Sequence, residues 1–191
     1  MTRWIRLTML CLVLAGMAGV TWLLNVRYWH TEDYRAVTPG VLYVADGLSR
    51  EFVERFRAHF TNLTVVDLVP DGAGSGADAT ALAEVDRLGL LQHIPVAADT
   101  LPTAPQAMQF LTICSDSNSH PVVLYAGRCA SPAHDVRVAT LEAAYVHWLR
   151  GRSLDEAIVA AGLDGHAAEG QVRELISTLQ RRKPPQPEET R

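Results

Sequence analysis

The feature that most constrains the fold is a regular alternation between short apolar or β-branched runs and longer segments with helical periodicity. Four runs have the length and composition of strands, and a helical pattern follows each of them: residues 41–44, 64–69, 91–96 and 121–125. The run TVVDLV is almost continuously β-branched or aliphatic, which is typical of a strand buried on both faces. Strands that alternate with helices at crossover length predict an α/β fold with a mostly parallel central sheet flanked by helices.

The helical segments carry signals for their buried faces and their ends. Phe52, Phe56 and Phe60 recur every four residues, so one face of their helix is apolar and is expected to face the core. Ser153 and Glu156 have the spacing of a capping box and predict a helix start. We predict four segments in all: 1–27 as a membrane anchor or uncleaved signal, 28–40 as a juxtamembrane segment, 41–182 as the α/β domain, and 183–191 as a disordered tail.

Composition limits the functions that this chain can have. With 191 residues, 48% of them apolar, the chain can bury one core. The formal charge is −4 and no basic block lies in the body of the chain, so nucleic acid is excluded as a main partner. Three cysteines are too few for a disulfide scaffold. Cys114 and Cys129 are predicted either as buried free thiols or as a pair, and no metal or cofactor is predicted.

The N-terminus has the pattern of a membrane segment. Leu7–Leu24 runs for 18 residues without a charge, which at ~1.5 Å per residue comes close to the thickness of a bilayer core. We predict contact with the membrane through residues 4–24, and Arg3 and Arg6 predict a cytoplasmic N-terminus. The alternative is a signal peptide cleaved near 16–18. Both interpretations place the C-terminal domain on the extracytoplasmic side.

A glycine-rich loop offers one hypothesis for function. Gly72–Ala77 fits the pattern G-x-G-x-x-[GA] between a predicted strand and a predicted helix, which is the context of a dinucleotide fingerprint. Asp71 would put a negative charge beside a pyrophosphate, and the composition is that of a slack connector. A nucleotide-binding domain is therefore the least favoured hypothesis for this chain.

Four stretches between Tyr34 and Gly162 carry a resemblance to a known family: YRAVTPGVLYVADGLSREFVERF, NLTVVDLVPD, LGLLQHIPVAADTLPTAPQAMQFL and VRVATLEAAYVHWLRGRSLDEAI. In this order they resemble segments of the bacterial branch of the cysteine-dependent protein-tyrosine and dual-specificity phosphatases. The resemblance implies a strand that leads into a phosphate-binding loop at a helix N-terminus. In that family a Cys-x5-Arg motif supplies a thiolate nucleophile and a phosphate-binding arginine, and a separate aspartic acid protonates the leaving group.

This chain departs from that motif. The resemblance implies that Arg137 is the phosphate-binding arginine and Asp99 the general acid. Ser131 occupies the spacing of the nucleophile, and the thiol of Cys129 lies two residues further from the arginine than the motif requires. A serine hydroxyl without an adjacent base is a poor nucleophile. Pro132, within the loop, has no N–H to give to a phosphate. A cation such as Arg137 near a helix N-terminus requires an anion, which is either phosphate or a structural carboxylate.

The sequence therefore predicts a membrane-anchored phosphatase-like domain that is catalytically impaired, a pseudophosphatase. It would bind a phosphorylated protein, a small phosphate ester or another anionic group. The alternative is an active phosphomonoesterase that uses Cys129 and Asp99 as catalytic residues with Arg137 as the phosphate-binding residue in a remodelled loop.

Overall fold

A computed structural model describes residues 34–45, 47–70, 77–97, 100–127 and 135–180. Its elements follow one another as β1 (Tyr34–Thr38), β2 (Leu42–Ala45), α2 (Arg50–His59), β3 (Thr64–Asp67), α3 (Ala77–Arg87), β4 (Leu91–His93), α4 (Ala104–Ser115), the short 3-10 helix η1 (Ser117–Ser119), β5 (Val122–Tyr125), α5 (Val136–Trp148), α6 (Leu154–Ala160) and α7 (Glu169–Gln180). The residues from Tyr34 onward form one compact unit.

The strands form a five-stranded sheet in the order β1-β2-β5-β3-β4. The pairs β2–β5, β5–β3 and β3–β4 are parallel, and only β1 is antiparallel to its neighbour β2. The predicted fold class, an α/β domain with a mostly parallel sheet flanked by helices, is confirmed. The predicted burial of the run at 64–69 is also confirmed, because Val65 and Val66 are inaccessible to solvent.

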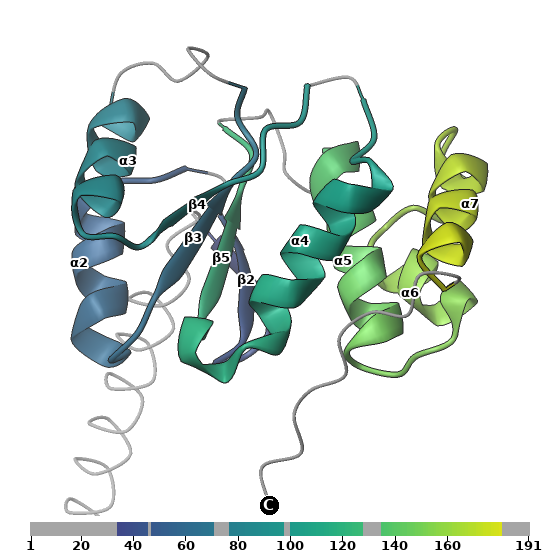
Figure 1. The fold of residues 1–191 in the computed structure, drawn as a ribbon, viewed down its shortest axis with the longest axis horizontal. Coiled ribbons are helices and arrows are strands. Elements are labelled where there is room, and N and C mark those ends of the chain that lie inside the picture. The colour runs from purple at the N-terminus through teal and green to yellow at the C-terminus, as the bar shows by residue number, and fades with distance from the viewer. Residues whose placement is uncertain (1–33, 46, 71–76, 98–99, 128–134, 181–191) are drawn as a thin grey trace, which may run out of the picture. The chain divides into compact units, whose positions relative to one another are not determined.

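Each face of the sheet carries its own apolar core. Helices α2 and α3 cover one face, and α4 and α5 cover the other, with α6 and α7 packed beyond α5 (Figure 1). Successive strand residues alternate between the two cores, as the pleat of a strand requires. Phe52 and Phe56 of α2 belong to the core on the α2–α3 face, so the expected apolar face of this helix is confirmed.

Helix starts agree with the sequence to within a few residues. The expected capping box of α6 is present: the Ser153 N–H donates to Glu156 Oε2 at 3.0 Å, and the Glu156 N–H donates to Ser153 Oγ at 3.2 Å. Helix α5 begins at Val136, with Asp135 as its N-cap. Helix α3 begins at Ala77.

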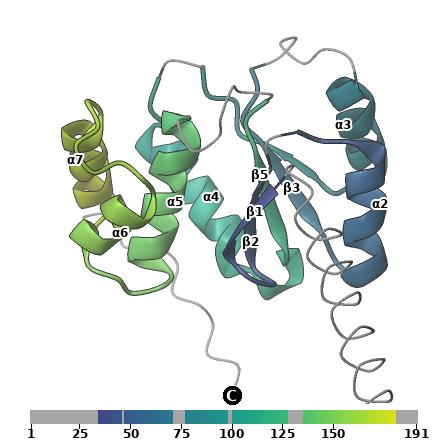
Figure 2. The ribbon, with the colours of Figure 1, turned by 180° about the vertical axis from the view of Figure 1, so that it is seen from behind.

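Strand β1 comes from the segment that the sequence assigns to a juxtamembrane connection. Its residues pair with β2 in the register Tyr34 to Ala45 (Figure 2). The strand lies at the edge of the sheet and none of its residues is fully buried, so it lacks the apolar run that marks the central strands. The sheet therefore starts seven residues before position 41, where the domain was predicted to start.

The predicted membrane anchor falls outside the described residues. Within the residues that the structure does describe, none of the helices has the length and apolar character needed to cross a bilayer. The predicted tail at 183–191 and the glycine-rich loop up to residue 76 also fall outside them. The anchor, the juxtamembrane residues before Tyr34 and the tail remain predictions from the sequence.

Candidate functional site

The candidate site lies where the parallel strands end. Strands β3, β4 and β5 run in the same direction, so their carboxyl ends meet along one edge of the sheet. The N-terminus of α5 reaches this edge, because the Arg137 side chain bonds to the chain just after β4 and β5. Open parallel sheets bind ligands at this edge in general. The resemblance in sequence also points here.

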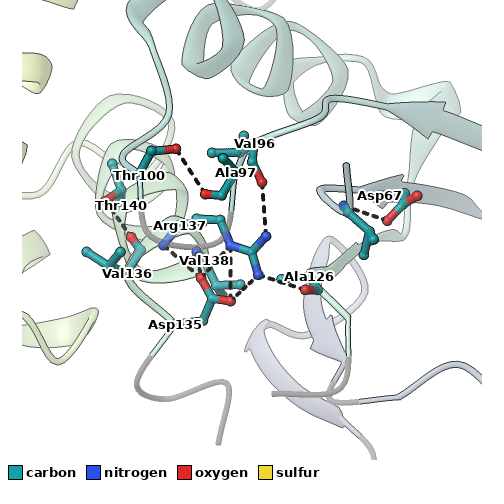
Figure 3. A network of polar contacts seen from close by, with 11 residues as sticks. Asp67, Val96, Ala97, Thr100, Ala126, Asp135, Val136, Arg137, Val138 and Thr140 are labelled. Carbon is teal, nitrogen blue, oxygen red and sulfur yellow. Dashed lines mark hydrogen bonds and ion pairs between the residues drawn. The ribbon is translucent and has the colours of Figure 1, made fainter. Parts of the chain in front are cut away.

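Arg137 lies in the first turn of α5 and is almost fully buried, with a side-chain exposure of 3%. One Nη1 hydrogen is donated to the carbonyl oxygen of Val96 at 3.0 Å, and Nη2 donates to the carbonyl oxygen of Ala126 at 2.8 Å (Figure 3). These two carbonyls belong to the segments that leave β4 and β5. The guanidinium is therefore fixed to the edge of the sheet by main-chain acceptors.

The carboxylate of Asp135 forms an ion pair with the same guanidinium. Arg137 Nη2 donates to Asp135 Oδ2 at 2.6 Å, and Nε donates to Oδ1 at 3.0 Å and to Oδ2 at 3.2 Å. Only 4% of the Asp135 side chain is exposed, so both partners of the pair are desolvated. Charge-assisted, two-point contacts of this kind are the strong class of hydrogen bond in proteins.

Asp135 also caps α5. Its Oδ1 accepts the main-chain N–H of Arg137 at 2.9 Å and that of Val138 at 3.5 Å. Aspartate is a favoured N-cap residue because it satisfies N–H groups that have no partner inside the helix. One carboxylate thus contacts both an arginine and a helix N-terminus, the two groups that hold a phosphate in proteins. The anion that Arg137 requires is, in this structure, a structural carboxylate.

A second buried carboxylate lies at the same edge. Asp67 ends β3 and is 5% exposed. Its Oδ1 accepts the N–H of Val69 at 2.9 Å, and its Oδ2 lies 3.3 Å from Nδ1 of His93, which ends β4. Burial raises the pKa of the Asp67 carboxyl, and the smaller effects of the Val69 N–H, His93 and Arg137 lower it. His93 thus connects the end of β4 to the end of β3 through Asp67.

The structure locates one of the predicted site residues. Arg137 lies at the expected edge of the sheet, and the guanidinium faces Asp135. Cys129, Ser131 and Asp99 lie outside the described residues, so their predicted roles as thiol, residue at the nucleophile spacing and general acid stay predictions. Cys114 is a buried thiol of α4, and burial strongly raises its pKa.

Sequence reasoning missed the role of Asp135 as the N-cap of α5 and as the anion beside Arg137. Two signals for it were present: an aspartate immediately before an apolar helical pattern is a common N-cap, and Arg137 needed an anion nearby. Sequence alone could not show that the cap and the anion are the same carboxylate. That depends on the Arg137 side chain folding back over the helix start rather than extending away from it.

Several solved structures have the same fold. The active form of Tk-PTP is 19% identical, over 80% of this chain and 99% of its own, with a TM-score of 0.60. PTPMT1 in complex with PI(5)P is 14% identical, over 79% and 99% of the two chains, with a TM-score of 0.58. The core catalytic domain of the PP-IP phosphatase SIW14 from S. cerevisiae, in complex with citrate, is 16% identical, over 78% and 92%, with a TM-score of 0.53.

No family model matches the sequence, and no curated protein matches it at a significant level. At these identities the solved structures establish the fold: it is that of the protein-tyrosine and dual-specificity phosphatases. The resemblance that the sequence indicated is confirmed at the level of the fold.

Proposed function

We propose that this chain is a membrane-anchored domain of phosphatase fold that does not turn over phosphate esters, a pseudophosphatase. The observation that carries the proposal is the ion pair between Arg137 and Asp135. The guanidinium that would bind a phosphate is buried, fixed to two carbonyls and already paired with an internal carboxylate. The sequence supports the same conclusion, because Ser131 stands at the spacing of the nucleophile.

The charges at this edge oppose a second anion. Among the residues that the structure describes, two buried carboxylates, Asp67 and Asp135, lie at this edge together with the Arg137 guanidinium. Phosphoryl transfer depends on cations and N–H groups that are oriented in advance toward the charge of the transition state. At an effective dielectric of 20, two like unit charges 4 Å apart repel by about 4 kcal/mol. A phosphate dianion would have to displace Asp135 from Arg137 and tolerate this repulsion.

An anionic partner remains part of the proposal. PTPMT1 was solved with PI(5)P and SIW14 with citrate, so neighbours of this fold bind anionic molecules. For this chain we propose a phosphorylated protein or a small phosphate ester as the partner. Binding is expected to be weak as long as Arg137 must exchange the Asp135 carboxylate for the ligand.

The proposed anchor places the domain on the extracytoplasmic side. Its support is the uncharged run Leu7–Leu24, which follows Arg3 and Arg6. We expect the full chain to sediment with membranes and to be released by detergent but not by alkaline carbonate. Protease added to intact spheroplasts should degrade the domain. Recovery in the soluble fraction at full length would contradict the anchor, and a shortened, soluble, exported chain would indicate a cleaved signal.

Hydrolysis of p-nitrophenyl phosphate by the purified full chain in detergent tests the central part of this proposal. We expect no turnover above that of buffer, and no change in the Cys129→Ser variant. Turnover that Cys129→Ser abolishes would instead establish the alternative, an active phosphomonoesterase. The variant Cys114→Ser is the matched control, because Cys114 is a buried thiol in α4 whose pKa is raised by burial.

A further inference from the structure

The Asp135 carboxylate contacts Arg137 in the way that a bound anion would. Both of its oxygens face the guanidinium, with Oδ2 2.6 Å from Nη2 and Oδ1 3.0 Å from Nε. The same Oδ1 accepts the N–H of Arg137 itself at 2.9 Å (Figure 3). A two-point contact with arginine plus a helix N–H is the set of donors that phosphate uses in proteins.

The arginine does not depend on Asp135 for its position. Val96 and Ala126 hold Nη1 and Nη2 through their carbonyl oxygens, at 3.0 and 2.8 Å. Both carbonyls belong to segments that follow sheet strands, whereas Asp135 belongs to the start of α5. Loss of the carboxylate charge would therefore leave the guanidinium held at the edge of the sheet.

We propose that Asp135 is a built-in inhibitory ligand. Its carboxylate occupies the face of Arg137 and the α5 N-terminus that would otherwise bind phosphate, so removal of its charge creates a binding site for inorganic phosphate or a phosphate monoester. This inference rests on the proposed function, because it concerns regulation of the same site.

Because Asp135 is connected to Arg137 by a short stretch of chain, we expect an external anion to compete poorly with its carboxylate. Asp135 lies two residues from Arg137, so its carboxylate has a high effective concentration at the guanidinium, in the range of mM or more that short connections give. A ligand that binds only the open form has its apparent affinity reduced by the fraction of molecules that are open. Asp67 adds a further negative charge near the arginine.

The test compares phosphate binding in the full-length wild type with that in Asp135→Asn. Asparagine is an equally good N-cap, so this variant removes the charge but keeps an acceptor for the first turn of α5. Thermal unfolding is followed as inorganic phosphate replaces chloride at constant ionic strength, since a ligand that binds the folded state raises the melting temperature. We expect the apparent affinity for phosphate to be at least tenfold higher in Asp135→Asn.

The control is the double variant Asp135→Asn/Arg137→Met, in which the gain should disappear. Asp135→Ser, a second capping residue without charge, should reproduce the gain if Asp135→Asn folds poorly. The proposal would be overturned if neither uncharged variant bound phosphate more tightly than wild type. It would also be overturned if the increase in affinity persisted in the double variant that lacks Arg137. Because the readout is binding rather than turnover, hydrolysis by the wild type would contradict the proposed function without deciding this result.

Discussion

In this structure the Arg137 guanidinium is paired with groups of the domain itself. An arginine suits a buried ion pair because its planar group matches a carboxylate at two points. Here that carboxylate is Asp135, and the acceptors Val96 O and Ala126 O take further N–H groups. A residue that resembles a phosphate-binding arginine thus serves to join α5 to the ends of two strands. In this structure its charge is paired internally.

Asp67 gives a prediction for the dependence of stability on pH. Burial raises the pKa of this carboxyl in the folded state, so the folded protein binds more protons than the unfolded chain above about pH 4. Stability therefore falls as pH rises from the unfolded pKa through the folded pKa. The variant Asp67→Asn lacks this group, so its free energy of unfolding should increase relative to wild type as pH rises above about 4.

Urea unfolding at a series of pH values checks this prediction. Asp86→Asn is the matched control, because residue 86 is exposed and lies on α3, away from the paired side chains of the edge. The control should follow the wild type at every pH. The free energy of unfolding of Asp67→Asn relative to wild type could instead stay constant or decrease as pH rises. Either result would show that burial is not the main influence on the pKa of Asp67.

At the level of the elements, the connection that leaves β5 is the tightest point of the edge. Gly127 has a φ of +86°, and a Cβ placed on it would lie 3.3 Å from Cγ2 of Val69. Gly40, in the turn between β1 and β2, has a similar φ of +76° but nothing within 4 Å of such a Cβ. Both glycines therefore have a left-handed backbone conformation, but only at Gly127 would a Cβ contact another side chain, that of Val69.

Alanine at each glycine separates these two effects. The left-handed conformation costs a non-glycine residue about 1–2 kcal/mol, and Gly40→Ala should lower the free energy of unfolding by that amount. Gly127→Ala should cost about 1 kcal/mol more, because Val69 must move to accommodate the new methyl group. Chemical denaturation of both variants measures the difference. Equal costs would mean that the contact with Val69 is absent or easily relieved.

The elements that sequence predicted well are those with strong patterns. The central strands were visible because they are buried on both faces, and α2 and α6 because of their apolar face and capping box. The edge strand β1 was not visible in the sequence, because half-exposed residues at a sheet edge show little alternation of apolar and polar side chains. For the site, the position of Arg137 followed from the resemblance to phosphatases, but its bond to Asp135 depends on side-chain conformation, which a sequence pattern does not determine.

At the scale of the whole molecule, the fold and the chemistry of the site are separate features. The domain has a five-stranded sheet with an apolar core on each face, and its fold matches that of solved phosphatase structures at 14–19% identity. None of these features requires a nucleophile, because packing on both faces of the sheet holds the domain together. Function depends on the site rather than on the fold, and the described part of this site contains two buried carboxylates beside its arginine.

A double-mutant cycle tests most directly whether Arg137 is paired with Asp135 inside the folded domain. Urea unfolding in phosphate-free buffer is measured for wild type, Asp135→Asn, Arg137→Met and the double variant. Arg137→Met alone should cost about 3–5 kcal/mol, because it leaves a buried carboxylate unpaired. The double variant should recover about 1–3 kcal/mol of the summed single effects.

Arg50→Met, at a position 79% exposed, is the control and should change the free energy of unfolding by no more than about 0.5 kcal/mol. Additive effects, or an Arg137→Met variant as stable as wild type, would contradict the account.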